Sequence, residues 1–329
     1  MSRFIVVGAG VFGASTALHL ARDTSNSEIY LFGLPIDSAQ PASIDINKVV
    51  RKEYASDLYR SLADEAMRAW QHEDFKSFYH KSGWVVIHGK QDSSLPRPPV
   101  ESKRMTQKEL RQRFDSVFEG CELEGEEDIT YDESIAWVEA TQALEKTLRL
   151  ACRAGVIYRT EEITELFFDD KKCNGVNLKS GEQLRGFSVV LAMGPWTGPF
   201  IARHSQLQTP IGLFTNAGIS TVAITLDEEE AQKYSRMPIL VRPTQGTSAP
   251  YIPLDRLMLT DLSGEIMPMD NNSRIKVTNA VGFTNGAMAT RGPIKGASLT
   301  SHLFGENRAL LAQFFPQFKA REFSQAWYC

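Results

Sequence analysis

A glycine-rich turn near the N-terminus constrains the fold more than any other feature of the sequence. Gly-Ala-Gly-Val-Phe-Gly over residues 8–13 joins a short apolar run, residues 4–7, to a segment with small and apolar residues at helical spacing, residues 11–22. In such a unit the first glycine permits the tight turn, the second lets the backbone approach a pyrophosphate, and the third lets the helix pack close to the strand. A second apolar run, residues 28–32, completes a β-α-β unit. We therefore expect an α/β fold whose sheet starts at the N-terminus.

The same turn predicts dinucleotide binding. Amide groups at the start of the helix would face an anion, helped by roughly half a positive charge from the helix dipole. The alternative is a purely structural glycine turn. An acidic residue is expected at the end of the second strand to bind the adenosine ribose, but here Phe32 runs into Gly33 and the nearest acid, Asp37, lies in a loop. Either the ribose is held in another way or the affinity for the cofactor is reduced.

Charge and composition exclude several other classes of protein. The formal net charge is -4 and there is no long Lys/Arg run, which argues against nucleic-acid binding because that needs a basic face. No apolar stretch reaches the roughly 20 residues that span a bilayer, and the N-terminal glycines favour the turn over a signal peptide. The four cysteines are far apart and the six histidines are scattered. We therefore expect no metal site and a reducing, cytoplasmic environment.

Helical and strand-like segments follow along the rest of the chain. The predicted elements are helices over residues 57–78, 105–114 and 139–154 and strands over residues 84–87, 155–158, 163–168 and 175–178. The last two strands belong to a β-meander that residues 188–193 close. Residues 213–284 hold many short β-like runs separated by turn residues, which predict a mostly antiparallel sheet over a substrate pocket.

A second motif of strand and glycine lies at residues 189–197. Its strand ends in small residues before Met193, Gly194 and Trp196, so we expect the backbone to come close to another group and the indole to supply an aromatic wall. Taken alone, the segment could equally be a core strand and a turn. Together with the N-terminal motif, it resembles the second FAD-contacting strand of flavoproteins with a glutathione-reductase-like dinucleotide fold.

The segment Ser-Ile-Asp-Ile-Asn-Lys-Val-Val-Arg, residues 43–51, carries the most specific resemblance. It is similar to a segment of the monomeric sarcosine oxidase and fructosyl-amino-acid oxidase family, particularly of its fungal amadoriase and saccharopine-oxidase-like members. The likeness covers nearly the whole chain, because it continues in residues 136–140, 275–277, 282–284 and 315–316.

The resemblance implies two interleaved domains. An FAD-binding domain of the Rossmann type would comprise residues 1–88, 136–210 and 318–329. A mostly antiparallel substrate domain would comprise residues 89–135 and 211–317. We expect a monomer.

The resemblance also implies an FAD enzyme that oxidises the C–N bond of an N-substituted amino acid or related amine to an imine and reduces oxygen to hydrogen peroxide. Lys48 would lie over the flavin and assist the oxygen reaction. Arg51 would hold the substrate carboxylate, because guanidinium pairs bidentately with carboxylate. The alternative is that both are solvated charges. The implied cofactor contacts are Gly8, Gly10, Val11, Phe12, Gly13, Ser43, Asn47, Lys48, Ile163, Met193, Gly194, Trp196 and Cys329.

The end of the chain leaves alternatives open. Family members often attach the flavin through a cysteine, and counting from residues 321–323 puts Cys329 at that position, whereas another alignment puts Ala326 there. The alternative is that Cys329 is an inert terminal cysteine. The family continues past this point with a flavin-contacting segment, so a truncated flavin-binding homologue without catalysis is the second hypothesis. An NAD(P)-dependent dehydrogenase, favoured only by the glycine turn, is the third. The terminus has no peroxisomal signal of the SKL type, which keeps the cytoplasm as the expected location.

Overall fold

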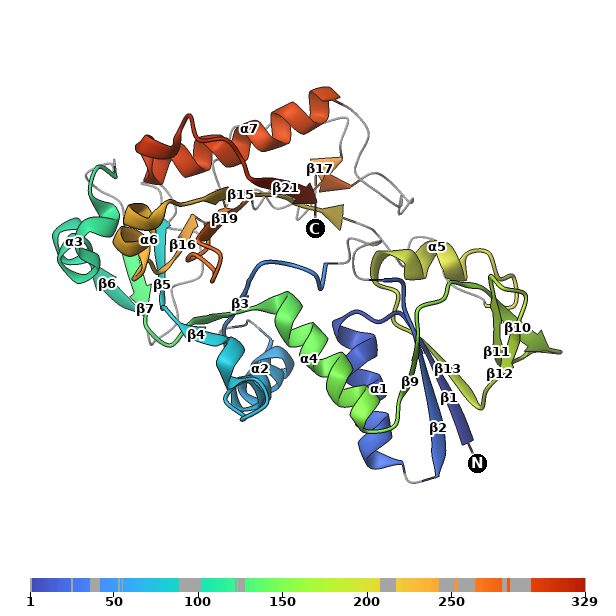
Figure 1. Ribbon diagram of the computed structural model, residues 1–329. Helices are drawn as coiled ribbons and strands as arrows, with labels where there is room; N and C mark the ends of the chain where they lie inside the picture. Colours follow the sequence, from blue (N-terminus) through green and yellow to red (C-terminus); the bar gives the residue numbers. More distant parts are fainter. Residues whose placement is uncertain are drawn as a thin grey trace. The chain divides into compact units, whose positions relative to one another are not determined.

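The computed structural model divides by its contacts into two compact units, and Figure 1 labels their elements. Unit 1 comprises Met1–Asp45, Ala140–Asn216 and Asn285–Gly292, and unit 2 comprises Ile46–Glu139, Ala217–Thr284 and Pro293–Cys329. The structure describes residues 2–24, 26–35, 42–52, 54, 56–88, 102–121, 123, 128–207, 217–242, 252–253, 264–279, 283–284 and 297–328.

Unit 1 is built on a parallel sheet with the strand order β13-β1-β2-β9. Its elements are β1 (Ser2–Val7), α1 (Val11–Asp23), β2 (Ser27–Phe32), α4 (Ala140–Arg153), β9 (Ile157–Arg159) and β13 (Ser188–Leu191). Successive side chains of a strand point to opposite faces. Val6 accordingly packs with residues of α1 and α4, whereas Ile5 and Val7 belong to a separate cluster. The two helices therefore cover one face of the sheet, and the predicted β-α-β unit is present.

A three-stranded antiparallel sheet covers the other face. It consists of β10 (Ile163–Asp169), β11 (Lys172–Leu178) and β12 (Gln183–Arg185), and its apolar side chains share a cluster with Ile5 and Val7. The prediction that residues 188–193 close this meander is wrong, because β12 closes it and β13 pairs in parallel with β1. A 3-10 turn over Gly194–Trp196 and the short helix α5 (Thr197–Ile201) follow β13.

Unit 2 is built on an eight-stranded sheet with the order β21-β15-β19-β18-β16-β5-β7-β6. Its strands are β5 (Trp84–His88), β6 (Lys103–Met105), β7 (Asp128–Asp132), β15 (Ser220–Thr225), β16 (Ile239–Arg242), β18 (Gly264–Ile266), β19 (Arg274–Asn279) and β21 (Gln325–Tyr328). Neighbouring strands are antiparallel except β5 and β16. The core of this unit also takes side chains from α3 (Gln107–Phe114), α6 (Glu228–Tyr234) and α7 (Ala297–Phe314). The predicted mostly antiparallel sheet is therefore present.

A small antiparallel sheet, β3-β8-β4, carries the candidate residues of unit 2. Its strands are β3 (Lys48–Val50), β4 (Tyr79–Lys81) and β8 (Ala136–Val138). Helix α2 (Asp57–Trp70) ends earlier than the predicted helix over residues 57–78, and a 3-10 turn over Lys76–Phe78 follows it. Short 3-10 helices also occupy Asp115–Phe118 and Pro316–Phe318. A further three-stranded pairing joins β14 (Ala217–Gly218), β17 (Ile252–Pro253) and β20 (Phe283–Thr284).

The compact units differ from the predicted domain boundaries, which put residues 1–88, 136–210 and 318–329 in the FAD-binding domain. Unit 2 contains β3, α2, β4 and β8 from these ranges. It also contains β5 and β21, which pair within its eight-stranded sheet. The physical reason is that a local run of strand-forming residues identifies a strand but not its partner. Compact units describe packing rather than cofactor contacts, so the functional division of the chain stays a prediction.

Candidate functional site

Backbone contacts hold the glycine turn of unit 1 and leave no room for a side chain at Gly8 or Gly13. Gly8 has a φ of +109°, and a Cβ atom there would lie 2.2 Å from the carbonyl oxygen of Ala192. A Cβ atom on Gly13 would lie 1.7 Å from the carbonyl oxygen of Gly8. Both distances are far below van der Waals contact, so both positions require glycine. The turn, the start of α1 and the end of β13 therefore meet closely here.

The start of α1 presents open amide groups. Its N-cap residue, Gly10, has no side chain that could cap the helix. The Val11 amide donates to Ser43 Oγ at 3.0 Å, and the amides of Phe12 and Gly13 have no partner among the described residues. The side chain of Phe12 is 80% exposed. A helix start with open amide groups of this kind suits an anion such as a pyrophosphate.

Packing explains why Gly33 stands where an acidic residue was expected. A Cβ atom on Gly33 would lie 2.4 Å from the Cβ atom of Ala9, so a carboxylate side chain does not fit unless the glycine turn moves. The Gly8 amide donates to the carbonyl oxygen of Phe32 at 2.7 Å, which holds the turn against the end of β2. Close packing thus explains why a glycine, and not an acidic residue, follows β2. Asp37 lies outside the described residues.

The residues after β13 lie in the same unit as the glycine turn. Gly194 has a φ of +55° and open space around it. The close backbone approach expected in this segment is made by Ala192, whose carbonyl oxygen lies against Gly8. Met193 packs against the cluster that contains Ile163. The indole nitrogen of Trp196 is buried and has no hydrogen-bond partner among the described residues. A buried N–H without an acceptor is costly, so this donor suits a polar group from a bound ligand.

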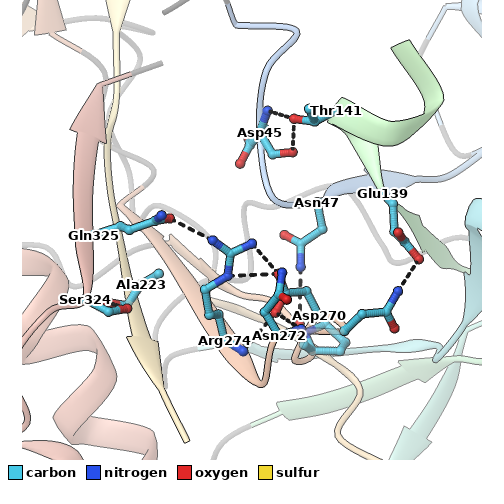
Figure 2. A network of polar contacts seen from close by, with 12 residues as sticks. Asp45, Asn47, Glu139, Thr141, Ala223, Asp270, Asn272, Arg274, Ser324 and Gln325 are labelled. Carbon is cyan, nitrogen blue, oxygen red and sulfur yellow. Dashed lines mark hydrogen bonds and ion pairs between the residues drawn. The ribbon is translucent and has the colours of Figure 1, made fainter. Parts of the chain in front are cut away.

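Two hydrogen bonds fix the chain at Asp45, the last residue of this stretch of unit 1. The Asp45 amide donates to Thr141 Oγ1 at 3.1 Å, and the same hydroxyl donates to the carbonyl oxygen of Asp45 at 2.9 Å (Figure 2). Ile44 packs in the apolar cluster under α1 and α4. The backbone that carries Ser43 is therefore anchored to the first turn of α4.

Asn47, in unit 2, is held from two sides immediately before Lys48. It is fully buried, and its Nδ2 atom donates to the carbonyl oxygen of Pro268 at 3.2 Å (Figure 2). Its own carbonyl oxygen accepts a bond of 2.6 Å from Lys276 Nζ. Lys276 is only 2% exposed, which places a buried ammonium group against the chain next to Lys48. No role was predicted for Lys276, because nothing in the β19 sequence shows that this lysine is buried.

Lys48 begins β3 and shares one face of the small sheet with Tyr79. Both residues stand opposite Val138 of the central strand β8, from its two sides. Burial raises the pKa of the Tyr79 phenol, so this group stays protonated at neutral pH.

Arg51 follows β3 and lies against two aromatic rings. Its guanidinium carbon is 4.9 Å from the centroid of the Tyr54 ring and 5.7 Å from that of Trp84. Within the described ranges, no carboxylate forms an ion pair with Arg51. Two cation–π contacts therefore hold the side chain and leave its N–H donors for an anion.

The predicted cofactor residues thus fall into two groups. Unit 1 holds Gly8, Gly10, Val11, Phe12, Gly13, Ser43, Ile163, Met193, Gly194 and Trp196, whereas unit 2 holds Asn47 and Lys48. Arg51, predicted to bind the substrate carboxylate, also belongs to unit 2. Ile163 begins β10, and its side chain is buried in the core of unit 1. Cys329 lies outside the described residues, while Cys121, Cys152 and Cys173 are free thiols.

In the part of the chain that the structure describes, the His, Cys, Asp and Glu side chains form no group of three or more that could hold a metal ion. None of the helices in this part of the chain has both the length and the apolar character that crossing a membrane requires.

Comparison with known proteins gives one family. The model of the family described as DAO, FAD dependent oxidoreductase, matches residues 3–329. L-saccharopine oxidase of Schizosaccharomyces pombe is 27% identical over 291 residues, which cover 78% of this chain and 64% of the relative. Peroxisomal sarcosine oxidase of Homo sapiens is 27% identical over 223 residues, which cover 64% of this chain and 53% of the relative. The chain therefore spans less than two thirds of these relatives.

A solved structure gives the same fold. The structure of the deglycating enzyme fructosamine oxidase from Aspergillus fumigatus, Amadoriase II, aligns with a TM-score of 0.76 at 23% sequence identity. The alignment covers 100% of this chain and 74% of that one. The predicted fold class, a glutathione-reductase-like α/β domain with an antiparallel second domain, is confirmed.

Proposed function

Since this chain belongs to the DAO family of FAD-dependent oxidoreductases, we propose that it binds FAD through the glycine turn and oxidises the C–N bond of an N-substituted amino acid to an imine. When bound, FAD would accept a hydride from the carbon beside the nitrogen and pass two electrons to oxygen, which yields hydrogen peroxide. The glycine turn carries the proposal: backbone atoms exclude a Cβ at Gly8 and Gly13, and the amides of Phe12 and Gly13 at the helix start have no partner among the described residues. The family match disfavours an NAD(P)-dependent dehydrogenase.

In unit 1, backbone and side-chain donors would bind the cofactor. The amides of Phe12 and Gly13 would bind the pyrophosphate, and Gly10 would let the backbone approach it. The Ser43 hydroxyl accepts from the Val11 amide, which leaves its own proton to donate to a phosphate oxygen. Trp196 Nε1 is a further donor. A charge-assisted hydrogen bond contributes about 1.5 to 3 kcal/mol, so a few of them would fix the cofactor.

In unit 2, two cations would serve the reaction. Lys48 would place a positive charge where oxygen is reduced, because a fixed cation stabilises developing negative charge. Arg51 would bind the substrate carboxylate through two parallel N–H bonds. The rings of Tyr54 and Trp84 support this role, because they hold the guanidinium without neutralising it.

The proposed substrate class is a small amino acid that carries a secondary amine. Saccharopine and sarcosine, after which the two relatives are named, are compounds of this class. Oxygen would be the second substrate. We further propose a cytoplasmic monomer that binds neither nucleic acid nor membrane, consistent with a net charge of -4.

The visible absorbance spectrum of the purified full chain tests the cofactor, and peroxide release with sarcosine and saccharopine tests the reaction. We expect a flavin spectrum, which bleaches when an amine substrate is added without oxygen. Protein that carries no flavin, and takes up none from added FAD, would refute the proposal. Flavin without peroxide release from a wider panel of secondary amino acids would favour the non-catalytic alternative.

A pair of glycine variants ties flavin binding to the turn. In Gly13→Ala the new Cβ would lie 1.7 Å from the Gly8 carbonyl oxygen, whereas Gly305 has open space around it. We expect Gly13→Ala to lose the flavin and Gly305→Ala to keep it. Equal flavin content in both variants would show that the turn does not bind the cofactor.

Acid precipitation tests the covalent linkage that the resemblance implies for Cys329. Yellow colour in the pellet of the parent chain, and in the supernatant of Cys329→Ser, would identify this residue as the attachment point. Colour released from both would show that the flavin is not covalently attached, with the rest of the proposal unchanged.

A further inference from the structure

We infer that Glu139 is a positioning residue: it fixes the strand β8, and through β8 it fixes Lys48. The inference rests on the proposed role of Lys48 in the oxygen reaction. Glu139 directly follows β8, whose last residue, Val138, stands opposite Lys48 in the ladder with β3. A change in the position of β8 therefore moves Lys48.

Glu139 joins three separate segments of unit 2. Its side chain is buried, with the residue 5% exposed, and its Oε1 atom accepts from Asn271 Nδ2 at 2.9 Å (Figure 2). The same oxygen lies 2.8 Å from Nε2 of His80 in β4. The Glu139 amide donates to the carbonyl oxygen of Phe78 at 3.0 Å. One residue thus ties the end of β8 to β4 and to the turn between β18 and β19.

The histidine partner is itself held in place. The His80 ring stacks on Trp137 of β8, with the ring centroids 4.1 Å apart and an interplanar angle of 25°. Trp137 is 6% exposed and packs in a cluster with Ile239 and Met267. The anchor around Glu139 therefore rests on a packed apolar base.

The anchor lies on the sheet face opposite Lys48. Side chains directly across an antiparallel ladder share a face, and successive residues alternate. Lys48 and Val138 therefore share one face, whereas Trp137 and His80, which stand opposite each other, share the other. The contacts of Glu139 can thus hold the sheet without occupying the space beside Lys48.

The strand that carries Lys48 is tied to the same turn. Asn47 donates to Pro268, which precedes the turn that also contains Asn271. Asp270 fixes the shape of this turn, because its Oδ1 atom accepts from the Arg274 amide at 2.9 Å and its Oδ2 atom accepts from Arg274 Nε at 2.9 Å (Figure 2). One turn therefore holds the residues before β3 and after β8.

The strands of the small sheet are short, so their positions depend on the anchors at their ends. The strands β3, β4 and β8 have 3 residues each, and so few ladder bonds define a strand position weakly. Side-chain anchors at the ends of β3 and β8 supply the missing restraint. A displacement of about 1 Å in a reacting group can reduce a rate roughly a hundredfold, so the restraint affects the chemistry assigned to Lys48.

The test is the rate at which oxygen reoxidises flavin that has been reduced with dithionite, measured per bound flavin in the full chain. We expect Glu139→Ala to slow this rate roughly tenfold. Glu139→Gln keeps an oxygen acceptor for Asn271 and His80, so it should remain within about twofold of the parent chain. A role in stability alone would not change the rate per bound flavin and would not produce this rescue.

Two further variants keep the test decisive if Glu139→Ala does not fold. Asn271 is exposed, so Asn271→Ala should fold, and it removes one of the two donors to Glu139. We expect it to slow reoxidation about threefold. Glu73→Ala removes a carboxylate of unit 2 that is 79% exposed, and it should leave the rate unchanged.

Lys48→Met separates failure of this inference from failure of the proposed function. If Lys48→Met slows reoxidation but Glu139→Ala and Asn271→Ala behave like the parent chain, the positioning role is overturned and the role of Lys48 stands. If Lys48→Met reoxidises at the parent rate, the premise is wrong and the inference fails with it.

Discussion

The two regions that carry the candidate residues are held in place by different means. In unit 1, the glycine turn is fixed by backbone atoms, and the Cβ atoms that glycine lacks would lie only 1.7 Å and 2.2 Å from carbonyl oxygens. In unit 2, the segment with Asn47 and Lys48 is fixed by polar side chains, among them Glu139 and Lys276. A turn that is fixed by backbone atoms has no room for an added Cβ atom, whereas a network of side chains can be weakened one hydrogen bond at a time.

The difference suits the two proposed tasks. A cofactor's pyrophosphate needs a close approach by backbone amides, which only glycine permits. A reacting cation needs a fixed position, which hydrogen-bonded anchors provide. We therefore expect changes in the turn to remove the cofactor, and changes in the network of unit 2 to alter stability or rate while the cofactor remains bound.

Gly8→Ala should have the largest effect. The new Cβ would meet Ala192 at 2.2 Å in a backbone conformation with a φ of +109°, and we expect a loss of about 3 kcal/mol in the free energy of unfolding together with the bound flavin. Urea unfolding and flavin absorbance measure the two effects. Gly155→Ala is the matched control, since Gly155 has a φ of +97° but open space around it. Equal losses in both variants would show that the φ angle, rather than the contact, makes glycine necessary.

His204→Ala tests whether side-chain anchors also matter in unit 1. His204 Nε2 accepts from the Leu166 amide at 2.9 Å, so Nδ1 carries the proton and donates to the carbonyl oxygen of Phe200 at 2.9 Å. The substitution leaves the Leu166 amide without this partner, whereas the Phe200 carbonyl oxygen keeps the Arg203 amide at 3.3 Å. We expect a loss of about 2 kcal/mol in the free energy of unfolding, measured with urea. Flavin content per folded chain should not change. His19→Ala, at an exposed position of α1, is the control, and loss of flavin in the His204 variant would break the contrast between the units.

Asn47→Ala should have a smaller effect in unit 2. It removes the bond to Pro268 at 3.2 Å and leaves a buried carbonyl oxygen without this donor, so we expect a loss of about 1 to 2 kcal/mol in the free energy of unfolding. The flavin should stay bound, in contrast to Gly8→Ala. The exposed Asn272→Ala serves as the control. A flavin-free Asn47 variant would mean that this residue also holds the cofactor.

Local motifs made much of unit 1 predictable from the sequence. The glycine turn lies between a strand and a helix within 22 residues of the N-terminus, and its geometry follows from the turn itself. The strand at residues 188–191 was found, but its partner β1 lies far away in the sequence and was missed. A local sequence pattern identifies a strand but does not predict which strand it will pair with. The same limit explains why the pairing of β5 and β21 within the eight-stranded sheet was not predicted.

The network of unit 2 was less predictable than the residues that it holds. Lys48 and Arg51 were found by resemblance, whereas the residues that hold Asn47, the neighbour of Lys48, come from distant parts of the chain. Asn47 is bonded to Pro268, 221 residues further on, and to Lys276, 229 residues further on. Hydrogen bonds over such separations depend on the completed sheet, and a lysine in a strand is ordinarily exposed. Burial of Lys276 could therefore be learned only from the fold.

The smallest expected effect is that of Glu182→Gln on the surface of unit 1. Two bonds from Arg159, of 2.7 Å and 2.9 Å, hold the pKa of Glu182 below its ordinary value of 4.5. A lowered pKa contributes stability that is present above pH 4.5 and is lost as the pH falls further. Urea midpoints of the parent chain should therefore fall more steeply in acid than those of Glu182→Gln.

High salt should reduce the difference between the two chains, because salt screens exposed charges. The backbone of Arg159 also accepts from the Gly33 amide at 3.1 Å, close to the glycine turn. The ion pair between Arg159 and Glu182 is therefore a side-chain contact close to the glycine turn. If backbone contacts alone hold the glycine turn in place, Glu182→Gln will keep its flavin at every salt concentration. Loss of flavin in this variant would show that the turn, too, depends on side chains around it.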